Sequence, residues 1–333
     1  MIKFLIMVIG VLVILNYIFT IDYRNEYINN TELNYLVLNM QEIPSSINLN
    51  LSEQYRLFNL EYNYKISYVN YDNNLENTKI ENVEEEKNEF YFLTEKISDF
   101  LINFENISVF YENLENRFTY AHNANEIYFG ASVTKLPFAF YIWQKAYNDN
   151  TNLNTKITYT QADYRGGSGI IRHNYEFGQM FTQRELLHLM ISPSDNIATR
   201  MLRRYHGINS YRNFIYEVGA NPNFVHNITY SHINAYDGGL FARKIFYFIQ
   251  EDNEFAQGFK RDLIANRYPF IFSDYTFASK SGWATEAYHD IAIVFAESPY
   301  TLTILSRKVG NQNDRNVFRE ISLFFQEINK FFY

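Results

Sequence analysis

A serine and a lysine three positions apart, Ser132 and Lys135, are the pair in this chain best suited to covalent chemistry. Positions i and i+3 share one face of a helix, so the hydroxyl and the amine are expected within hydrogen-bond reach. A serine hydroxyl is a weak nucleophile until a base accepts its proton. A lysine is such a base when burial or a second ammonium group lowers its pKa. We therefore expect Ser132 to be a nucleophile and Lys135 its base, at the start of a helix whose free N–H groups favour negative charge.

A second string, Ser194-Asp195-Asn196, follows a serine and a proline that end the preceding segment. Ser194 can pass a proton between Lys135 and a leaving nitrogen. The amide of Asn196 can both donate to and accept from a substrate amide. Asp195 is interpreted as the N-cap of the next helix, a structural role typical of this residue.

A third string, Lys280-Ser281-Gly282, ends an apolar run that is typical of a strand. We expect Lys280 to be the second ammonium group beside Lys135 and, with Ser281, to bind a substrate carboxylate. Gly282 allows a ligand to approach the backbone. The backbone N–H groups of Trp283 and Ser132 would then form an oxyanion hole.

Each string alone is common, as a helix start, an N-cap or a surface turn, but their order and separations resemble the serine, "SDN" and "KTG" elements of class A β-lactamases and penicillin-recognising peptidases. The resemblance covers about residues 95–330 and extends to further segments, which are Ala121-His122-Asn123-Ala124, Phe129-Gly130-Ala131, Gly167-Ser168-Gly169-Ile170-Ile171, the run 182–199 and the run 289–294. It implies an acyl-enzyme mechanism on a β-lactam or on a peptidoglycan stem peptide.

One departure from the family concerns the "ExxLN" loop, whose glutamate activates the water that clears the acyl-enzyme. Residues 219–234 contain no Asp or Glu, and the preceding Glu217 lies in a run typical of a helix. His226 or His232 could be a substitute base near neutral pH, although both also fit as polar loop residues. Acylation is therefore expected to be intact, while β-lactam turnover is expected to be impaired.

Three further residues receive weaker assignments. Trp283 stands where the family usually has a small residue, which would narrow the cleft. His289 lies near the position where some members have a carboxylate-binding arginine. Tyr164 could wall the entrance to the cleft, or it is an ordinary loop aromatic.

Composition excludes several classes of function. The formal net charge is −8 and the basic residues are scattered, so nucleic acid is not an expected partner. The absence of cysteine removes disulfides and thiolate metal sites, and we expect neither a metal nor another cofactor.

The N-terminus consists of Lys3 followed by an apolar run over residues 4–21. This pattern is typical of an export signal, and its length approaches that of a spanning helix. No small-residue cleavage site follows, which favours an uncleaved signal anchor over residues 1–22; a cleaved signal and a secreted chain are the alternative. The positive-inside rule then places the rest of the chain outside the cytoplasm. We expect a stalk or small β-rich module at 23–87, with a strand-like run at 89–93, and a hydrolase domain at 88–333.

Periodicity along that domain predicts strands and a helix first, a helical middle, then strands and a closing helix, which is the order of an α+β fold. The resemblance implies that these elements form a three-layer α/β/α sandwich. Its antiparallel sheet would combine a hairpin over 108–120 with late strands at 277–281, 291–295 and 302–305. An all-helical lobe would be inserted between these strands. Flanking helices are expected at 95–103 and 317–331, and a capping box begins at Thr182.

Three functions are compatible with these residues. The first is a membrane-anchored serine hydrolase that opens a β-lactam or related amide through a Ser132 acyl-enzyme. The second is a D-alanyl-D-alanine peptidase or penicillin-binding protein, which the missing glutamate favours. The third is a catalytically idle binding or sensor module at the cell surface, which the three intact strings disfavour.

Overall fold

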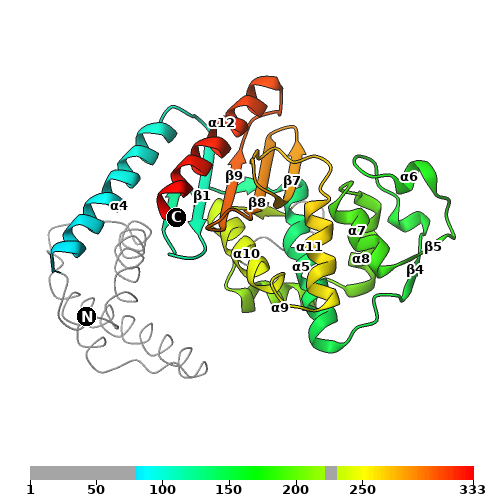
Figure 1. The fold of residues 1–333 in the computed structure, drawn as a ribbon. Helices are drawn as coiled ribbons and strands as arrows, with labels where there is room; N and C mark the ends of the chain where they lie inside the picture. Colours follow the sequence, from blue (N-terminus) through cyan, green and yellow to red (C-terminus); the bar gives the residue numbers. More distant parts are fainter. Residues whose placement is uncertain (1–79, 222–230) are drawn as a thin grey trace, which may run out of the picture. The chain divides into compact units, whose positions relative to one another are not determined.

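A five-stranded antiparallel sheet forms the centre of the computed structural model, which describes residues 80–221 and 231–333 (Figure 1). Its strand order is β2-β1-β9-β8-β7. The strands are β1 (Ile107–Asn113), β2 (Thr119–His122), β7 (Phe277–Ala284), β8 (Ala287–Val294) and β9 (Tyr300–Ser306). Early strand β1 pairs with late strand β9, with Val109 opposite Ile304, so the two ends of the domain meet in one sheet as predicted.

Side chains alternate along each strand and divide the apolar residues between two layers. On β1, Val109 and Tyr111 pack with the helices α4 (Ile80–Leu101) and α12 (Gln312–Asn329). Phe110, between them, packs against the helices on the other face. Figure 1 shows α12 beside the sheet and the helical lobe beyond it. The predicted three-layer α+β architecture is confirmed.

The inserted lobe is almost entirely helical. Its helices are α5 (Lys135–Asp149), α6 (Ile171–Asn174), α7 (Gln183–Ile191), α8 (Asn196–His206), α9 (Asn209–Val218), α10 (Ala235–Phe248) and α11 (Glu254–Ile264). Two short ladders brace it, β3 (Tyr128–Phe129) with β6 (His232–Ile233) and β4 (Lys156–Thr158) with β5 (Met180–Thr182). Single turns of 3-10 helix lie at Ala131–Thr134, Gln161–Asp163 and Lys330–Phe332.

Two local predictions were wrong. The strand-like run at 89–93 lies inside α4, which also begins earlier than the helix expected at 95–103. Leu93, Ile97 and Leu101 recur every four residues and are buried against the sheet, so helical spacing prevails over the local strand propensity. Ser132 lies on a 3-10 turn, and the α-helix begins only at Lys135.

Among the described residues, no helix combines the length and apolar character needed to cross a bilayer. The predicted anchor (1–22) and nearly all of the predicted stalk (23–79) lie outside the described residues, as does His226.

Candidate active site

Ser132 is held in the 3-10 turn Ala131–Thr134 between β3 and α5. Ala131 immediately before it has φ +43°, a left-handed conformation that is unfavourable for alanine. The turn is anchored by the Gly130 N–H, which donates to the carbonyl of Ser231 at 2.9 Å. The predicted nucleophile is therefore presented by a short, strained and well-tied turn.

Lys135, one turn later, is buried and points at the second string. Its Nζ donates to the Ser194 carbonyl at 2.6 Å, to Ser194 Oγ at 3.1 Å and to Asn196 Oδ1 at 2.8 Å. Within residues 80–221 and 231–333, no hydrogen bond joins this amine to Ser132 Oγ. The amine and Ser194 thus meet as predicted, whereas the Ser132 hydroxyl and the Lys135 amine, expected within hydrogen-bond reach of each other, do not form a hydrogen bond.

The environment of Lys135 favours the neutral amine. Burial lowers its pKa well below the usual value, and the nearby charge of Lys280 lowers it further. Asp195 acts in the opposite direction. A lowered pKa raises the fraction of the amine that is neutral, and only the neutral form can accept a proton as a general base must.

Asp195 fastens the second string to the loop before α6. One carboxylate oxygen accepts from the N–H groups of Ile197 (2.8 Å) and Ala198 (3.0 Å), which caps α8. The other accepts from Ile170 (2.7 Å) and Ile171 (2.8 Å). The structural role expected for Asp195 is confirmed, and it explains why a short "GSGI" segment lies beside this string.

Asn196 is the third member of the hydrogen-bonded group that contains Lys135 and Ser194. Its Oδ1 accepts from Lys135, and its Nδ2 donates to the carbonyl of Gly166 at 2.9 Å. Nδ2 carries a second hydrogen that remains available for a substrate carbonyl. Tyr164, two residues before Gly166, is 55% exposed on the same loop, at a position compatible with a wall of the cleft.

Gly282 brings the third string against the nucleophile. A methyl group at this position would lie 2.8 Å from the Ser132 backbone nitrogen and 2.6 Å from that of Val133. Only glycine therefore allows edge strand β7 to pack against this turn. Lys280, two residues earlier and on the same face of the strand, is fully buried.

Lys280, like Lys135, has a carboxylate nearby that favours its charged form. Burial lowers the pKa of Lys280 to about 8, and Asp290 raises it. Asp290 is fully buried on β8, where it pairs in register with Ser281. Its Oδ2 accepts from the N–H groups of Phe270 (2.7 Å) and Ile271 (3.0 Å). The sequence interpretation gave no role to Asp290, although a charged residue inside an apolar strand is itself unusual.

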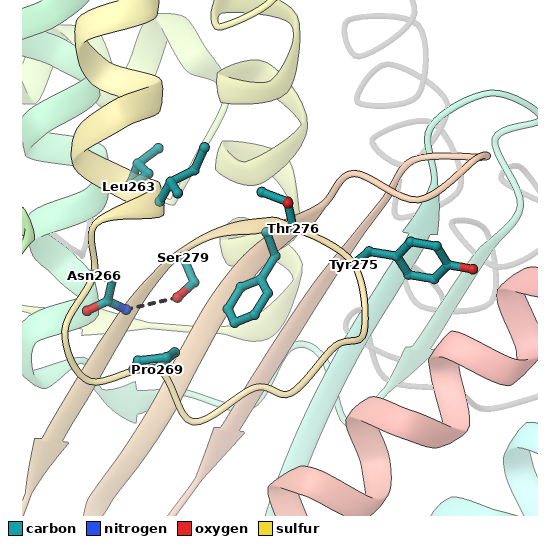
Figure 2. A pocket seen from close by; sticks show the side chains of 8 residues that line it. Leu263, Asn266, Pro269, Tyr275, Thr276 and Ser279 are labelled. Carbon is teal, nitrogen blue, oxygen red and sulfur yellow. Dashed lines mark hydrogen bonds between the residues drawn. The ribbon is translucent and has the colours of Figure 1, made fainter.

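Ser281 lies on the opposite face from Lys280 and donates its hydroxyl to the Tyr268 carbonyl at 2.5 Å. Asn266 donates to Ser279 Oγ at 2.9 Å, and Figure 2 shows these two side chains facing each other beneath the end of α11. The loop after α11, which carries Asn266 and Tyr268, is thus hydrogen-bonded to two serines of β7. Binding of a substrate carboxylate by Ser281 would require this hydroxyl to leave Tyr268.

The position of His289 corrects its tentative assignment. The ring is fully buried, with Nε2 donating to the Phe129 carbonyl (2.9 Å) and Nδ1 accepting from the Ser306 N–H (3.1 Å). Burial lowers its pKa to about 4, so the ring is neutral at ordinary pH. Both nitrogens are used inside the fold, and neither is available to a substrate carboxylate.

Trp283 follows Gly282, and its side chain is 67% exposed. Its indole N–H donates to the Val309 carbonyl at 2.9 Å, which holds the ring across the end of β7. The ring is therefore fixed against the loop that follows β9, on the face of β7 opposite to that of Gly282. In the described part of the chain, no three His, Cys, Asp or Glu side chains are grouped as metal ligands would be.

Comparisons with known proteins agree with this geometry. Residues 92–244 and 251–328 match the model of the beta-lactamase enzyme family. No curated protein sequence matches the chain. A beta-lactamase from Chitinophaga pinensis DSM 2588 has 18% identity and a TM-score of 0.63, covering 71% of this chain and 98% of that one.

PBP-A has 16% identity and a TM-score of 0.63, with 71% of this chain and 96% of that one covered. A mutant of PBP-A, solved as an acyl-enzyme complex with penicillin G, has 17% identity and a TM-score of 0.61, covering 71% and 97%. These TM-scores establish a shared fold.

Proposed function

Because the chain belongs to the beta-lactamase enzyme family, we propose that it is a serine hydrolase that opens a strained or D-configured amide through an acyl-enzyme on Ser132. One observation carries the proposal. A buried lysine, one turn after the serine, has a lowered pKa and is hydrogen-bonded to Ser194 and Asn196. This contact joins the residues that we propose as general base and proton relay, one turn after the proposed nucleophile.

In the proposed reaction, Ser132 Oγ attacks the carbonyl carbon while its proton moves to Lys135 Nζ. The backbone N–H groups of Ser132 and Trp283 stabilise the oxyanion. The C–N bond then breaks, and Ser194 passes the proton from Lys135 to the leaving nitrogen. Water releases the acyl group and regenerates the free serine.

Recognition of the substrate is assigned to the cations and amides around the turn. Lys280, charged below about pH 8, attracts the carboxylate that β-lactams and stem peptides both carry. Asn196 donates its second Nδ2 hydrogen to the acyl amide of the substrate. The penicillin G complex of a PBP-A mutant supports a β-lactam as a reactant for this fold.

Slow release of the acyl group is the expected kinetic signature. Residues 219–234 lack a carboxylate, and loss of a general base lowers a rate by about 10²–10⁴-fold. This favours a penicillin-binding D-alanyl peptidase over a rapid β-lactamase. His232 is exposed on β6 opposite Phe129 and is the substitute base to test within the described residues.

The test is exposure of the purified full chain to a fluorescent penicillin, followed by intact-mass measurement. A persistent adduct that disappears in Ser132→Ala supports the proposal and the peptidase alternative. A transient adduct with rapid release of product indicates a β-lactamase with another base. Equal labelling of the wild-type and Ser132→Ala chains, or no reaction with penicillin or a D-Ala-D-Ala peptide, would refute catalysis by this site.

We further propose that residues 1–22 anchor the chain in a membrane with the hydrolase domain on the extracytoplasmic side. The support is the Lys3-led apolar run and the absence of a cleavage pattern after it. Carbonate extraction of membranes and protease accessibility in intact cells test this location. Release of the chain by carbonate, or full protection from external protease, would contradict it.

A further inference from the structure

A second concave site lies between β5, α7 and α11, and none of the catalytic strings contributes to it. Its volume is about 590 Å³, within the usual range for small-molecule sites. The lining combines apolar and charged side chains, which are Tyr175, Gln179, Met180, Phe181, Arg184, Glu185, His188, Leu189, Gly258, Arg261 and Asp262.

The cationic side of this hollow consists of Arg184 on α7 and Arg261 on α11. In the described part of the chain, neither guanidinium has a carboxylate within ion-pair distance or donates a side-chain hydrogen bond. Arg184 lies over the buried Trp143 ring, 4.6 Å from its centroid. Gly258 makes room for this arrangement, since a methyl group there would collide with the Arg184 guanidinium and the Trp143 ring. Arg184 is thus pre-positioned without its charge being neutralised.

The two acids of the hollow each make a contact within the fold, although among the described residues Asp262 Oδ2 is buried without a hydrogen-bond partner. Glu185 Oε2 accepts from the N–H (2.7 Å) and the hydroxyl (2.9 Å) of Thr182, closing the capping box of α7. Asp262 Oδ1 is bonded to His188 Nδ1 at 2.9 Å, a contact that also joins α7 to α11. This contact raises the pKa of His188 and so favours its positive form. The two arginines and the two acids of the lining balance in formal charge, and protonation of His188 makes the hollow positive, in a chain whose net charge is −8.

The other wall is apolar and open to solvent. Met180 is 60% exposed and Tyr175 is 39% exposed, beside the buried ring of Phe181. Contact between this wall and the apolar part of a ligand is favourable, because it removes apolar surface from water.

We propose that this hollow binds a small organic carboxylate with an apolar body. The carboxylate pairs with Arg184 and Arg261, whose planar guanidinium groups suit bidentate recognition. The apolar body lies against Met180 and Tyr175.

The test uses the purified full chain and isothermal titration with 4-phenylbutyrate, with its neutral amide as the matched ligand. Saturable binding is expected, at least tenfold weaker for the amide and at least tenfold weaker in Arg184→Gln and in Arg261→Gln. Arg319→Gln is the control variant, because Arg319 also lies over an aromatic ring, Phe272, but on α12. Its affinity should match that of the wild type.

A separate variant distinguishes this hollow from the catalytic cleft, where Lys280 also attracts carboxylates. Binding of 4-phenylbutyrate should persist in Lys280→Met. Loss of binding in that variant would assign the probe to the cleft and overturn the proposal. No saturable binding, equal binding of the amide, or unchanged affinity in both arginine variants would also overturn it. Circular dichroism verifies that each variant is folded.

Discussion

The two buried lysines of the cleft have the same side chain and different charged neighbours. Lys135 is bonded to a carbonyl, a hydroxyl and an amide oxygen, and Lys280 donates to the Ser281 carbonyl at 2.8 Å. Each has a carboxylate whose charge raises its pKa, Asp195 for Lys135 and Asp290 for Lys280, but the positive charges of Lys280 and Arg203 lower the pKa of Lys135 further. The comparison teaches that neighbouring like charges, added to burial, separate a lysine suited to accept protons from one suited to hold an anion.

The largest expected effect comes from removing the amine of Lys135, the proposed general base. Lys135→Met keeps an unbranched apolar chain but leaves no proton acceptor beside Ser132. Acylation by a fluorescent penicillin should slow by about 10²–10⁴-fold, the usual contribution of general base catalysis. The measurement is the labelling rate under excess probe. Lys145→Met on the same helix is the control, because Lys145 is exposed and paired only with Asp149. A normal rate in Lys135→Met would remove the lysine from the mechanism.

The contact between β7 and the turn that carries Ser132 can be tested through Gly282→Ala. The added methyl group would meet the backbone nitrogens of Val133 and Ser132, so β7 and the turn must separate. We expect a loss of about 1–3 kcal/mol in the free energy of unfolding, as for other overpacked sites, together with slower acylation. Urea denaturation measures the first effect. Gly166→Ala is the control, because its methyl group would lie 3.8 Å from the Arg172 side chain. An unperturbed Gly282→Ala chain would contradict the close packing.

Asp290→Asn removes the carboxylate that raises the pKa of Lys280, the lysine proposed to bind the substrate carboxylate. Without the negative charge, the pKa of Lys280 should fall below about 8, so the alkaline limb of the acylation profile should move to lower pH. Acylation near neutral pH should fall about tenfold if the pKa falls by about one unit below that pH. The measurement is the labelling rate across a pH series. Asp314→Asn, at another buried carboxyl bound to backbone N–H groups, controls for general destabilisation and should leave the limb in place.

The smallest effect concerns stability. The pKa of Lys280 is about 8 in the folded chain and about 10.5 when unperturbed. Between these values the unfolded chain binds a proton that the folded chain lacks, so the free energy of unfolding rises with pH. We expect a rise of about 1 kcal/mol between about pH 8 and about pH 9 from this group alone. Lys280→Met should flatten the curve in chemical denaturation. An equal slope in that variant would show that Lys280 does not titrate in this range.

Much of the fold follows from patterns that are local in the chain. The capping box at Thr182, the Asp195 cap and the late apolar strands are visible as residue types at fixed spacing, and the structure has them where they were expected. The start of α4 was missed because its first turns are acidic and polar. The recurrence of Leu93, Ile97 and Leu101 marks the buried face of this helix in its second half.

The residues of the site were easier to predict from the sequence than the contacts among them. The strings named Ser132, Lys135, Asn196 and Lys280, but pairing across strands decides what each side chain meets. Register places His289 with Gly282 and sends its ring into the fold, and it places Asp290 opposite Ser281. These relations join residues that are distant in sequence, so no local pattern contains them.

Two residues in the left-handed region flank the proposed machinery, Ala131 at φ +43° and Ser194 at φ +58°. A glycine would adopt a positive φ at little cost and would also change to a negative φ at little cost. Alanine and serine stay there only while surrounding contacts oblige them to. If packing around either loop is lost, both backbones should relax, carrying the nucleophile and the relay apart. A partly unfolded chain should therefore be chemically silent, so that reactivity toward penicillin reports the integrity of the whole domain.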